Sequence, residues 1–225
     1  MQMTMTKELE KRLRLMQRFN QVLGDKRRAG ERVYNDKIFV HNGIMYATDG
    51  HILVVAANLT GQRGFSFFKC GGKKFEYLDS IAQEVKEVKE ATRDGEVYER
   101  ILEPLNCASV SFDIDFEGFK LPVNLCSRWS KRWEDKLTVN FQTEEAVIDF
   151  CGGLEGMGGV TGTYGDIIKN VSGTVPENPM KFALWNILEI MRQCKVSKVR
   201  IESCLDRNLN TCKVGDYTFL FTRCD

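Results

Sequence analysis

The sequence predicts an α+β fold in which one helix followed by three antiparallel strands is the repeated unit. Three observations favour this class. Amphipathic helical patterns alternate with clusters of short strands, Asn-Gly and Asp-Gly pairs separate the strands, and the unit recurs about four times at a spacing of roughly 55 residues. Two units in each domain give two similar domains, which we place at residues 1–112 and 113–225.

The composition is that of a folded protein. The 225 residues are 43% hydrophobic and 28% charged, which excludes disorder and collagen-like repeats. No apolar run approaches the roughly 18 residues of a membrane span, and the N-terminal segment is too charged for a signal peptide. We therefore expect a cytoplasmic protein that does not bind membranes.

The cysteines and histidines do not form a metal-binding pattern. The chain has eight cysteines and two histidines, and no two cysteines are spaced as CxxC. Without a secretory signal the thiols are expected to stay reduced. The sequence thus predicts no metal site and no cofactor.

The clearest predicted helix covers residues 5–23. Its apolar residues recur at helical spacing along one face: Leu9, Leu13, Met16, Phe19 and Leu23. Four cations recur at spacings of four, three and four along the opposite face: Lys7, Lys11, Arg14 and Arg18. Solvated faces usually mix both signs of charge, so this face is either a solvated surface or a local site for a polyanion.

Three strands are predicted within residues 32–58, joined by turns at Asn42-Gly43 and Asp49-Gly50. The second unit is predicted as a strand over 65–70, a helix over 74–91 and an alternating strand over 110–115. The outer face of the 74–91 helix is largely acidic, which is unfavourable for contact with a polyanion.

The third and fourth units are more distinct. We expect a helix over 122–133 with strands before and after it, and a glycine-rich loop over 152–165 that lacks the ending of a phosphate-binding loop. We expect a final helix over 178–195, followed by three strands that end at residue 222. Cations face away from the apolar sides of these two helices: Arg128, Lys131, Arg132, Lys181 and Arg192.

Several segments carry a resemblance to a known family. ATDGHILVV at residues 47–55 resembles the ATDGHRLA segment of bacterial DNA polymerase sliding clamps, the processivity β subunit. FKLPVNLCSRWSKRW resembles the strand and proline that precede an inner helix of those clamps. The C-terminal segments NPMKFALWNIL, SKVRIES and YTFLFTRCD resemble their last helix, a late strand and the closing strand.

The resemblance implies a DNA clamp fold and a protein without catalytic activity. Such a clamp encircles duplex DNA without reading its sequence and tethers a replicative DNA polymerase. Bacterial clamps have three domains and close as dimers, whereas this length fits two domains, as in phage and eukaryotic clamps, which close as trimers. The resemblance therefore implies a homotrimeric ring of the phage or mobile-element type.

Two sets of site residues follow from the resemblance. Cations on the helices would face phosphates in the lumen: Lys7, Lys11, Arg14, Arg18, Arg128, Lys131, Arg132, Lys181 and Arg192. An apolar pocket would hold peptides of the DNA polymerase and the clamp loader, and its residues by resemblance are Thr48, Gly50, His51, Ile52, Leu53, Leu220 and Phe221.

Two alternatives remain. An enzyme would need a nucleophile with a base, for which Cys70 or Cys107 with His51 is the available combination. A clamp-like adaptor or inhibitor would keep the fold and bind a replication protein without encircling DNA. The acidic face of the 74–91 helix and the net charge of +1 favour that second alternative.

Overall fold

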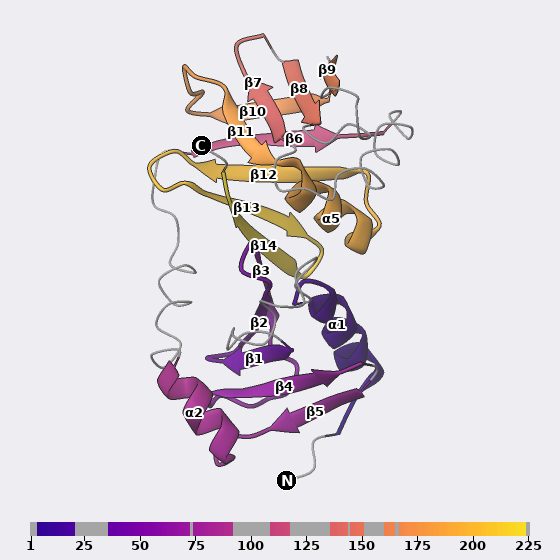
Figure 1. The fold of residues 1–225 in the computed structure, drawn as a ribbon, viewed down its shortest axis with the longest axis vertical. Helices are drawn as coiled ribbons and strands as arrows, with labels where there is room; N and C mark the ends of the chain where they lie inside the picture. Colours follow the sequence, from indigo (N-terminus) through magenta and orange to yellow (C-terminus); the bar gives the residue numbers. More distant parts are fainter. Residues whose placement is uncertain are drawn as a thin grey trace. The chain divides into compact units, whose positions relative to one another are not determined.

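The computed structural model describes residues 4–20, 36–72, 74–91, 109–117, 136–143, 145–150, 160–164 and 167–223. The chain divides into two compact units. Unit 1 comprises Met1–Leu105 with Asp216–Thr218, and unit 2 comprises Asn106–Gly215 with Phe219–Asp225. Figure 1 shows the elements of both units, coloured along the sequence. The domain bounds expected at 112/113 stay a prediction, and β6 (Ser109–Asp115) runs through that position.

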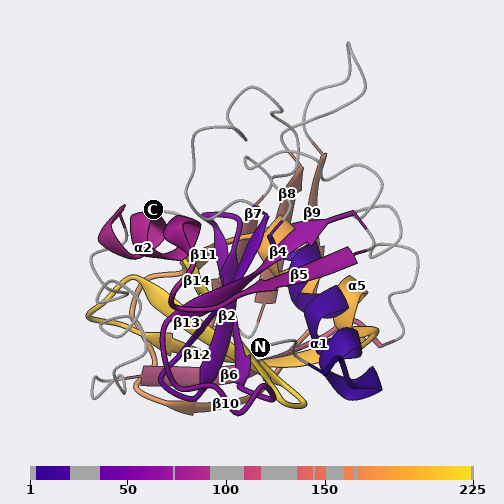
Figure 2. The ribbon, with the colours of Figure 1, turned by 90° about the horizontal axis from the view of Figure 1, so that it is seen from below.

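Unit 1 contains a five-stranded antiparallel sheet in the order β3-β2-β1-β4-β5. Helix α1 packs against β1 and β2, and Figure 2 shows β4 and β5 side by side. The bounds of these elements are α1 Lys7–Arg18, β1 Lys37–His41, β2 Ile44–Thr48, β3 Ile52–Ala57, β4 Ser66–Gly71, β5 Lys74–Leu78 and α2 Gln83–Ala91.

Aromatic side chains form the centre of unit 1. The Phe39 ring on β1 stacks on Tyr46 of β2 with centroids 5.2 Å apart, and it meets Phe67 of β4 edge-on at 5.9 Å. All three rings are fully buried. The two predicted hairpins form as expected, and Gly43 supplies the positive φ of 82° that the first turn requires.

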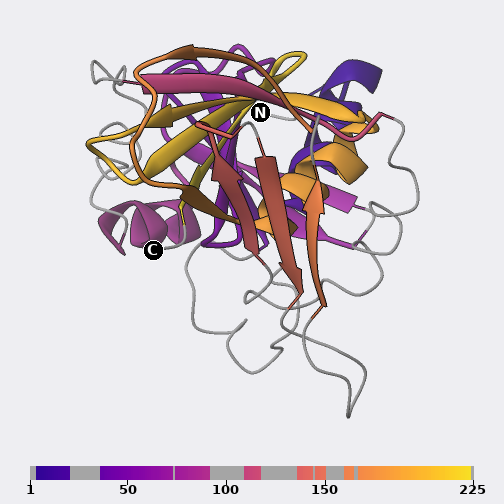
Figure 3. The same ribbon diagram turned by 90° about the horizontal axis from the view of Figure 1, so that it is seen from above.

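Unit 2 contains two antiparallel sheets. One has the order β10-β6-β12-β13-β14 and the other β11-β7-β8-β9; Figure 3 shows β7, β8 and β9 side by side. Helix α5 contacts β11 and β7. Besides β6, the bounds are β7 Lys136–Asn140, β8 Glu145–Phe150, β9 Val160–Tyr164, β10 Ile168–Gly173, β11 Met180–Ala183, α5 Leu184–Cys194, β12 Lys198–Cys204, β13 Leu209–Val214 and β14 Tyr217–Thr222.

Strand β10 is irregular, and among the described strands it is an edge strand of its sheet. Its register with β6 shifts between Lys169 and Ser172, and Asn170 within the shift has a φ of 53°. Gly173 has a φ of 94°, and a Cβ there would lie 2.2 Å from the carbonyl oxygen of Ser109. Glycine is therefore required by backbone conformation and by the close approach of β6.

Two predicted helices are shorter than expected. Residues 74–78 form β5, and α2 begins only at Gln83, because Phe75 and Tyr77 face residues of β4 across an antiparallel ladder. The predicted 178–195 helix begins at Leu184, because residues 180–183 pair with β7 as strand β11. In both places the spacing of apolar residues predicted a helix, but the segment pairs with a neighbouring strand instead.

The glycine-rich segment was expected to be a loop, but residues 160–164 form strand β9 and pair with β8. Helix α1 ends at Arg18, with Phe19 as its C-cap. The predicted helix 122–133 lies outside the described residues, as does Leu23 of the first helix.

Candidate functional site

Helix α1 presents a row of cations to solvent. Thr6 caps its first turn, because the Thr6 hydroxyl accepts a hydrogen bond from the backbone N–H of Leu9 at 3.1 Å. Leu9, Leu13 and Met16 are buried, which turns the opposite face outward. We call the four exposed cations of that face, Lys7, Lys11, Arg14 and Arg18, the α1 cationic face.

The α1 cationic face is not uniformly free of negative charge. The guanidinium of Arg14 donates to the Glu10 carboxylate one turn earlier, with Nε 3.1 Å from Oε1. Both side chains are about half exposed, so a pair of this kind contributes little to stability and is readily exchanged for another anion.

Arg12 lies on the buried side of α1, and the sequence analysis did not single it out. Its side chain is 5% exposed, and its guanidinium donates to the carbonyl oxygen of Ala57 at 2.6 Å and to Asp216 at 3.1 Å. A signal was present, since position 12 lies three residues after Leu9 and four before Met16. A cation within an apolar stripe indicates a buried polar contact.

The other predicted DNA-contacting cations differ from expectation or lie outside the described part of the chain. Lys181 belongs to strand β11 and not to a helix. Arg192 is on α5 and donates to the buried Glu189, at 3.0 Å from Nε and 2.8 Å from Nη2. The remaining three, Arg128, Lys131 and Arg132, lie outside the described residues.

The Thr48 to His51 segment forms a self-contained turn between β2 and β3. The Thr48 hydroxyl accepts from the backbone N–H of Gly50 at 2.9 Å. The Asp49 carboxylate accepts from the N–H groups of His51 and Ile52 at 2.8 and 2.9 Å. Turn chemistry therefore accounts for the Thr-Asp-Gly pattern. Burial raises the pKa of Asp49, although the two backbone hydrogen bonds oppose that shift.

The predicted partner pocket draws on both units. Gly50 and His51 are exposed in unit 1, while Ile52 and Leu53 are buried residues of β3. Leu220 and Phe221 are buried residues of β14 in unit 2. A joint pocket formed by these two segments stays a prediction.

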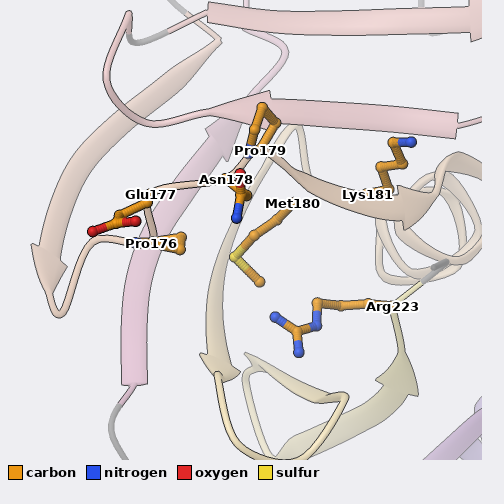
Figure 4. Close-up of a pocket in the computed structure, with 7 residues that line it drawn as sticks. All are labelled: Pro176, Glu177, Asn178, Pro179, Met180, Lys181 and Arg223. Carbon is orange, nitrogen blue, oxygen red and sulfur yellow. The ribbon is translucent and has the colours of Figure 1, made fainter.

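A pocket of about 380 Å³ lies within unit 2, beside the end of the closing strand. Figure 4 shows the side chains of Met180 and Arg223 projecting into the space bordered by Pro176 and Asn178. Pro179, Glu177 and Lys181 complete its lining. The pocket thus combines an apolar wall from the two prolines and the methionine with cationic groups.

Arg223 is held in place by the turn between β12 and β13. Asn208 accepts from the backbone N–H of Arg223 at 2.9 Å and from its Nε at 3.2 Å, and a terminal nitrogen of Arg223 donates to the Leu205 carbonyl at 3.3 Å. Arg223 also forms an isolated bridge with Phe182 of β11. The guanidinium is therefore preorganised beside the pocket.

Two carboxylates of β6, Asp113 and Asp115, form ion pairs with cations of β10 and β12. Burial alone would raise the pKa of Asp113, but hydrogen bonds from Asn170, Lys198 and Arg200 lower it overall. The backbone N–H of Glu117, with Lys169, lowers the pKa of Asp115. These carboxylates are internally satisfied, and this network is structural.

The cysteines do not support a nucleophilic site among the described residues. Burial raises the pKa of the Cys70 thiol to about 12, whereas a nucleophile needs a lowered pKa. Cys107 lies outside the described residues. The expectation that all thiols stay reduced is wrong for Cys204, which is disulfide-bonded.

Comparisons with known proteins find similarity in the fold. The DNA polymerase III subunit beta of Borrelia burgdorferi superposes with a TM-score of 0.56 at 12% identity over 96% of this chain and 61% of its own. The sliding clamp of Bacillus subtilis gives 0.53 at 12% identity over 97% and 62%, and the subunit beta of Pseudomonas aeruginosa 0.53 at 14% over 96% and 65%. This chain spans less than two thirds of each.

Neither protein-family models nor curated proteins match the chain. Among the described residues no helix is long and apolar enough to cross a membrane, and no three potential metal ligands cluster. The antiparallel α+β architecture and the superpositions agree with the resemblance at residues 47–55. The chain has the α+β fold of the DNA polymerase sliding clamps.

Proposed function

We propose that this protein is a non-catalytic sliding clamp that encircles duplex DNA and tethers a replicative DNA polymerase. The observation that carries the proposal is the α1 cationic face, four exposed cations on the helix of a clamp fold. Lysine and arginine on a helix can meet phosphates without reading base edges, which is the interaction that a mobile clamp needs.

Ring closure is part of this proposal. Two clamp-like domains in each chain would reach six domains in a ring as a homotrimer, the arrangement expected from the length of the sequence. Light scattering over a range of concentrations tests it. A mass of three chains that does not change on dilution would support the ring, and a monomer at every concentration would contradict it.

The pocket beside Arg223 is the proposed docking site for peptides of the polymerase and the clamp loader. Pro176, Pro179 and Met180 offer apolar contact, and Arg223 offers a fixed positive charge. A short peptide with an apolar side chain next to a carboxylate would satisfy both. Binding of such a peptide should be lost in Arg223→Met and retained in Lys213→Met, a matched change at an exposed cation of β13.

The DNA test replaces Lys7, Lys11, Arg14 and Arg18 with alanine, which suits exposed helix positions. If all four meet phosphates, the slope of log affinity against log salt should fall by about 3 to 4, since each contact contributes about 0.9. A control with the same change in charge replaces exposed cations elsewhere: Lys86, Lys89, Arg207 and Lys213. Equal slopes for the two variants would contradict the proposal.

A clamp-like adaptor that binds a replication protein without encircling DNA is the second candidate. It is favoured by the cations that the fold withdraws from a DNA surface, because Lys181 is on a strand and Arg192 is bound to Glu189. An adaptor would bind the peptide but show no salt-dependent affinity for DNA. The DNA experiment above therefore separates the candidates.

A further inference from the structure

We propose that Arg12 is a positioning residue that fastens the tip of the β13–β14 hairpin to α1 and thereby fixes the direction of the α1 cationic face. The inference rests on the proposed function only for its DNA measurement. Its structural part concerns contacts within unit 1, to which Asp216–Thr218 belong although most of that hairpin belongs to unit 2.

The contacts of Arg12 come from two segments, the end of β3 and the hairpin tip at residues 216–217. One terminal nitrogen donates to the carbonyl oxygen of Ala57, the last residue of β3, and the other donates to Asp216 at the start of the hairpin tip. The guanidinium carbon lies 5.8 Å from the ring centroid of Tyr217, within cation–π range. A planar fork can make these contacts together, whereas a lysine ammonium cannot reach them all from one point.

The burial of the two partners makes the contact asymmetric. The Arg12 side chain is 5% exposed, while that of Asp216 is 75% exposed. A charge buried in this way is costly unless it is paired, so α1 is held most firmly when the hairpin tip is in contact with it. Asp216 can be replaced without opening the core.

The position of Arg12 on the helix explains the effect on the cationic face. Residue 12 lies about 100° from residue 11 and 200° from residue 14 around the helix axis, so a fixed Arg12 leaves Lys11 and Arg14 turned to solvent. Gln17 donates to the Gly72 carbonyl at 3.0 Å and adds a second anchor toward the end of α1. Without Arg12 the helix would keep the Gln17 contact near its end and lose the contacts that hold its middle.

Hydrogen exchange of the full chain tests the anchor. Asp216→Asn should speed exchange of the α1 amides about two- to fivefold, the range for one exposed partner of an ion pair. Arg12→Lys should speed it roughly tenfold or more, because an ammonium cannot keep both hydrogen bonds of the buried guanidinium. Asp216→Glu should restore protection. The controls Asp206→Asn and Arg14→Lys, at exposed positions, should leave α1 unchanged.

Two results would overturn the proposal. One is unchanged α1 exchange in both Asp216→Asn and Arg12→Lys; the other is an equal increase throughout both units, which would mean that the contact serves global stability alone. Circular dichroism at the same temperature verifies that each variant is folded.

DNA affinity gives a second readout whose sign is diagnostic. Removing the negative charge of Asp216 would by electrostatics alone raise the affinity for DNA. If Arg12 and Asp216 position the cationic face, Asp216→Asn should instead lower it about twofold or more, in line with the exchange effect, and Asp216→Glu should restore it. An increase in affinity would contradict the positioning role. If the quadruple alanine variant of α1 shows no DNA effect, the proposed function fails, while the exchange result still decides the anchor.

Discussion

Helix α1 buries one face, whereas helix α5 is buried on all sides over residues 186–191. In α1 the buried stripe is narrow and the opposite face carries exposed cations. In α5 the buried residues run around the helix: Leu184, Asn186, Ile187, Leu188, Glu189, Ile190 and Met191. The difference teaches that two helices at equivalent places in a repeated unit need not serve the same surface.

The largest expected effect is the loss of stability when buried side chains of the two helices are truncated. Leu13→Ala in α1 and both Ile187→Ala and Leu188→Ala in α5 should each lower the free energy of unfolding by about 2–5 kcal/mol, because all three side chains are buried. Arg14→Ala, next to Leu13, should change it by less than about 0.5 kcal/mol. Chemical denaturation measures each value. A tolerant Leu188→Ala would contradict the all-round burial of α5.

The two units also differ in how much stability a glycine-to-alanine change should cost. Gly173→Ala in unit 2 should cost about 3 kcal/mol or more, because it combines a left-handed backbone with a close approach to Ser109. Gly43→Ala in the first hairpin of unit 1 has open space and should cost only about 1–2 kcal/mol for its φ. Thermal melts of both variants provide the measurement, and equal losses would mean that β6 moves away.

Charge on the two helices should have opposite consequences. Arg192→Ala leaves the buried Glu189 with fewer donors and should cost about 1–3 kcal/mol of stability without changing DNA affinity. Lys11→Ala should leave stability unchanged and lower the salt slope of DNA binding by about 0.9. Denaturation and a salt titration of DNA binding would be run on both proteins. A lower DNA affinity in Arg192→Ala would indicate that α5 contacts DNA after all.

The smallest effect is the dependence of stability on pH. The pKa values of Asp113 and Asp115 are lowered, so their contribution in unit 2 is present above about pH 4, the ordinary range of an aspartate, and is lost as the pH falls through the lowered values. The pKa of Asp49 in unit 1 is raised, so its contribution is present at low pH and is lost as the pH rises through the raised value.

Asparagine variants measured by thermal denaturation between pH 3 and 7 separate the two contributions. Asp113→Asn with Asp115→Asn should flatten the loss of stability on acidification, and Asp49→Asn should steepen it. The same pH curve for all three proteins would contradict the assignment.

Local patterns were sufficient for much of unit 1 and for the last strands. Asn-Gly and Asp-Gly pairs marked hairpins whose turns are closed by backbone and side chains within a few residues. The exposed face of α1 followed from its helical period alone. The fold class followed from the order of elements together with the resemblance at residues 47–55.

Contacts between distant segments could not be anticipated. Residues 74–78 and 180–183 were assigned to helices because their strand pairing depends on β4 and β7, which lie elsewhere in the chain. The helical spacing indicated a buried polar contact at Arg12, but its partners Ala57 and Asp216 could not be identified because they are far away in sequence. The pocket beside Arg223 was missed for the same reason, since residues 176–181 come next to it only in the fold.

Among the described strands β10 lies at an edge of its sheet, and its irregularity has a consequence for solubility. A regular edge strand offers a row of free N–H and carbonyl groups on which another chain can grow a sheet. The register shift beside Asn170 interrupts that row, and the charged Lys169 stands at its start. At this edge the protein is thereby guarded against the uncontrolled strand addition that leads to aggregation.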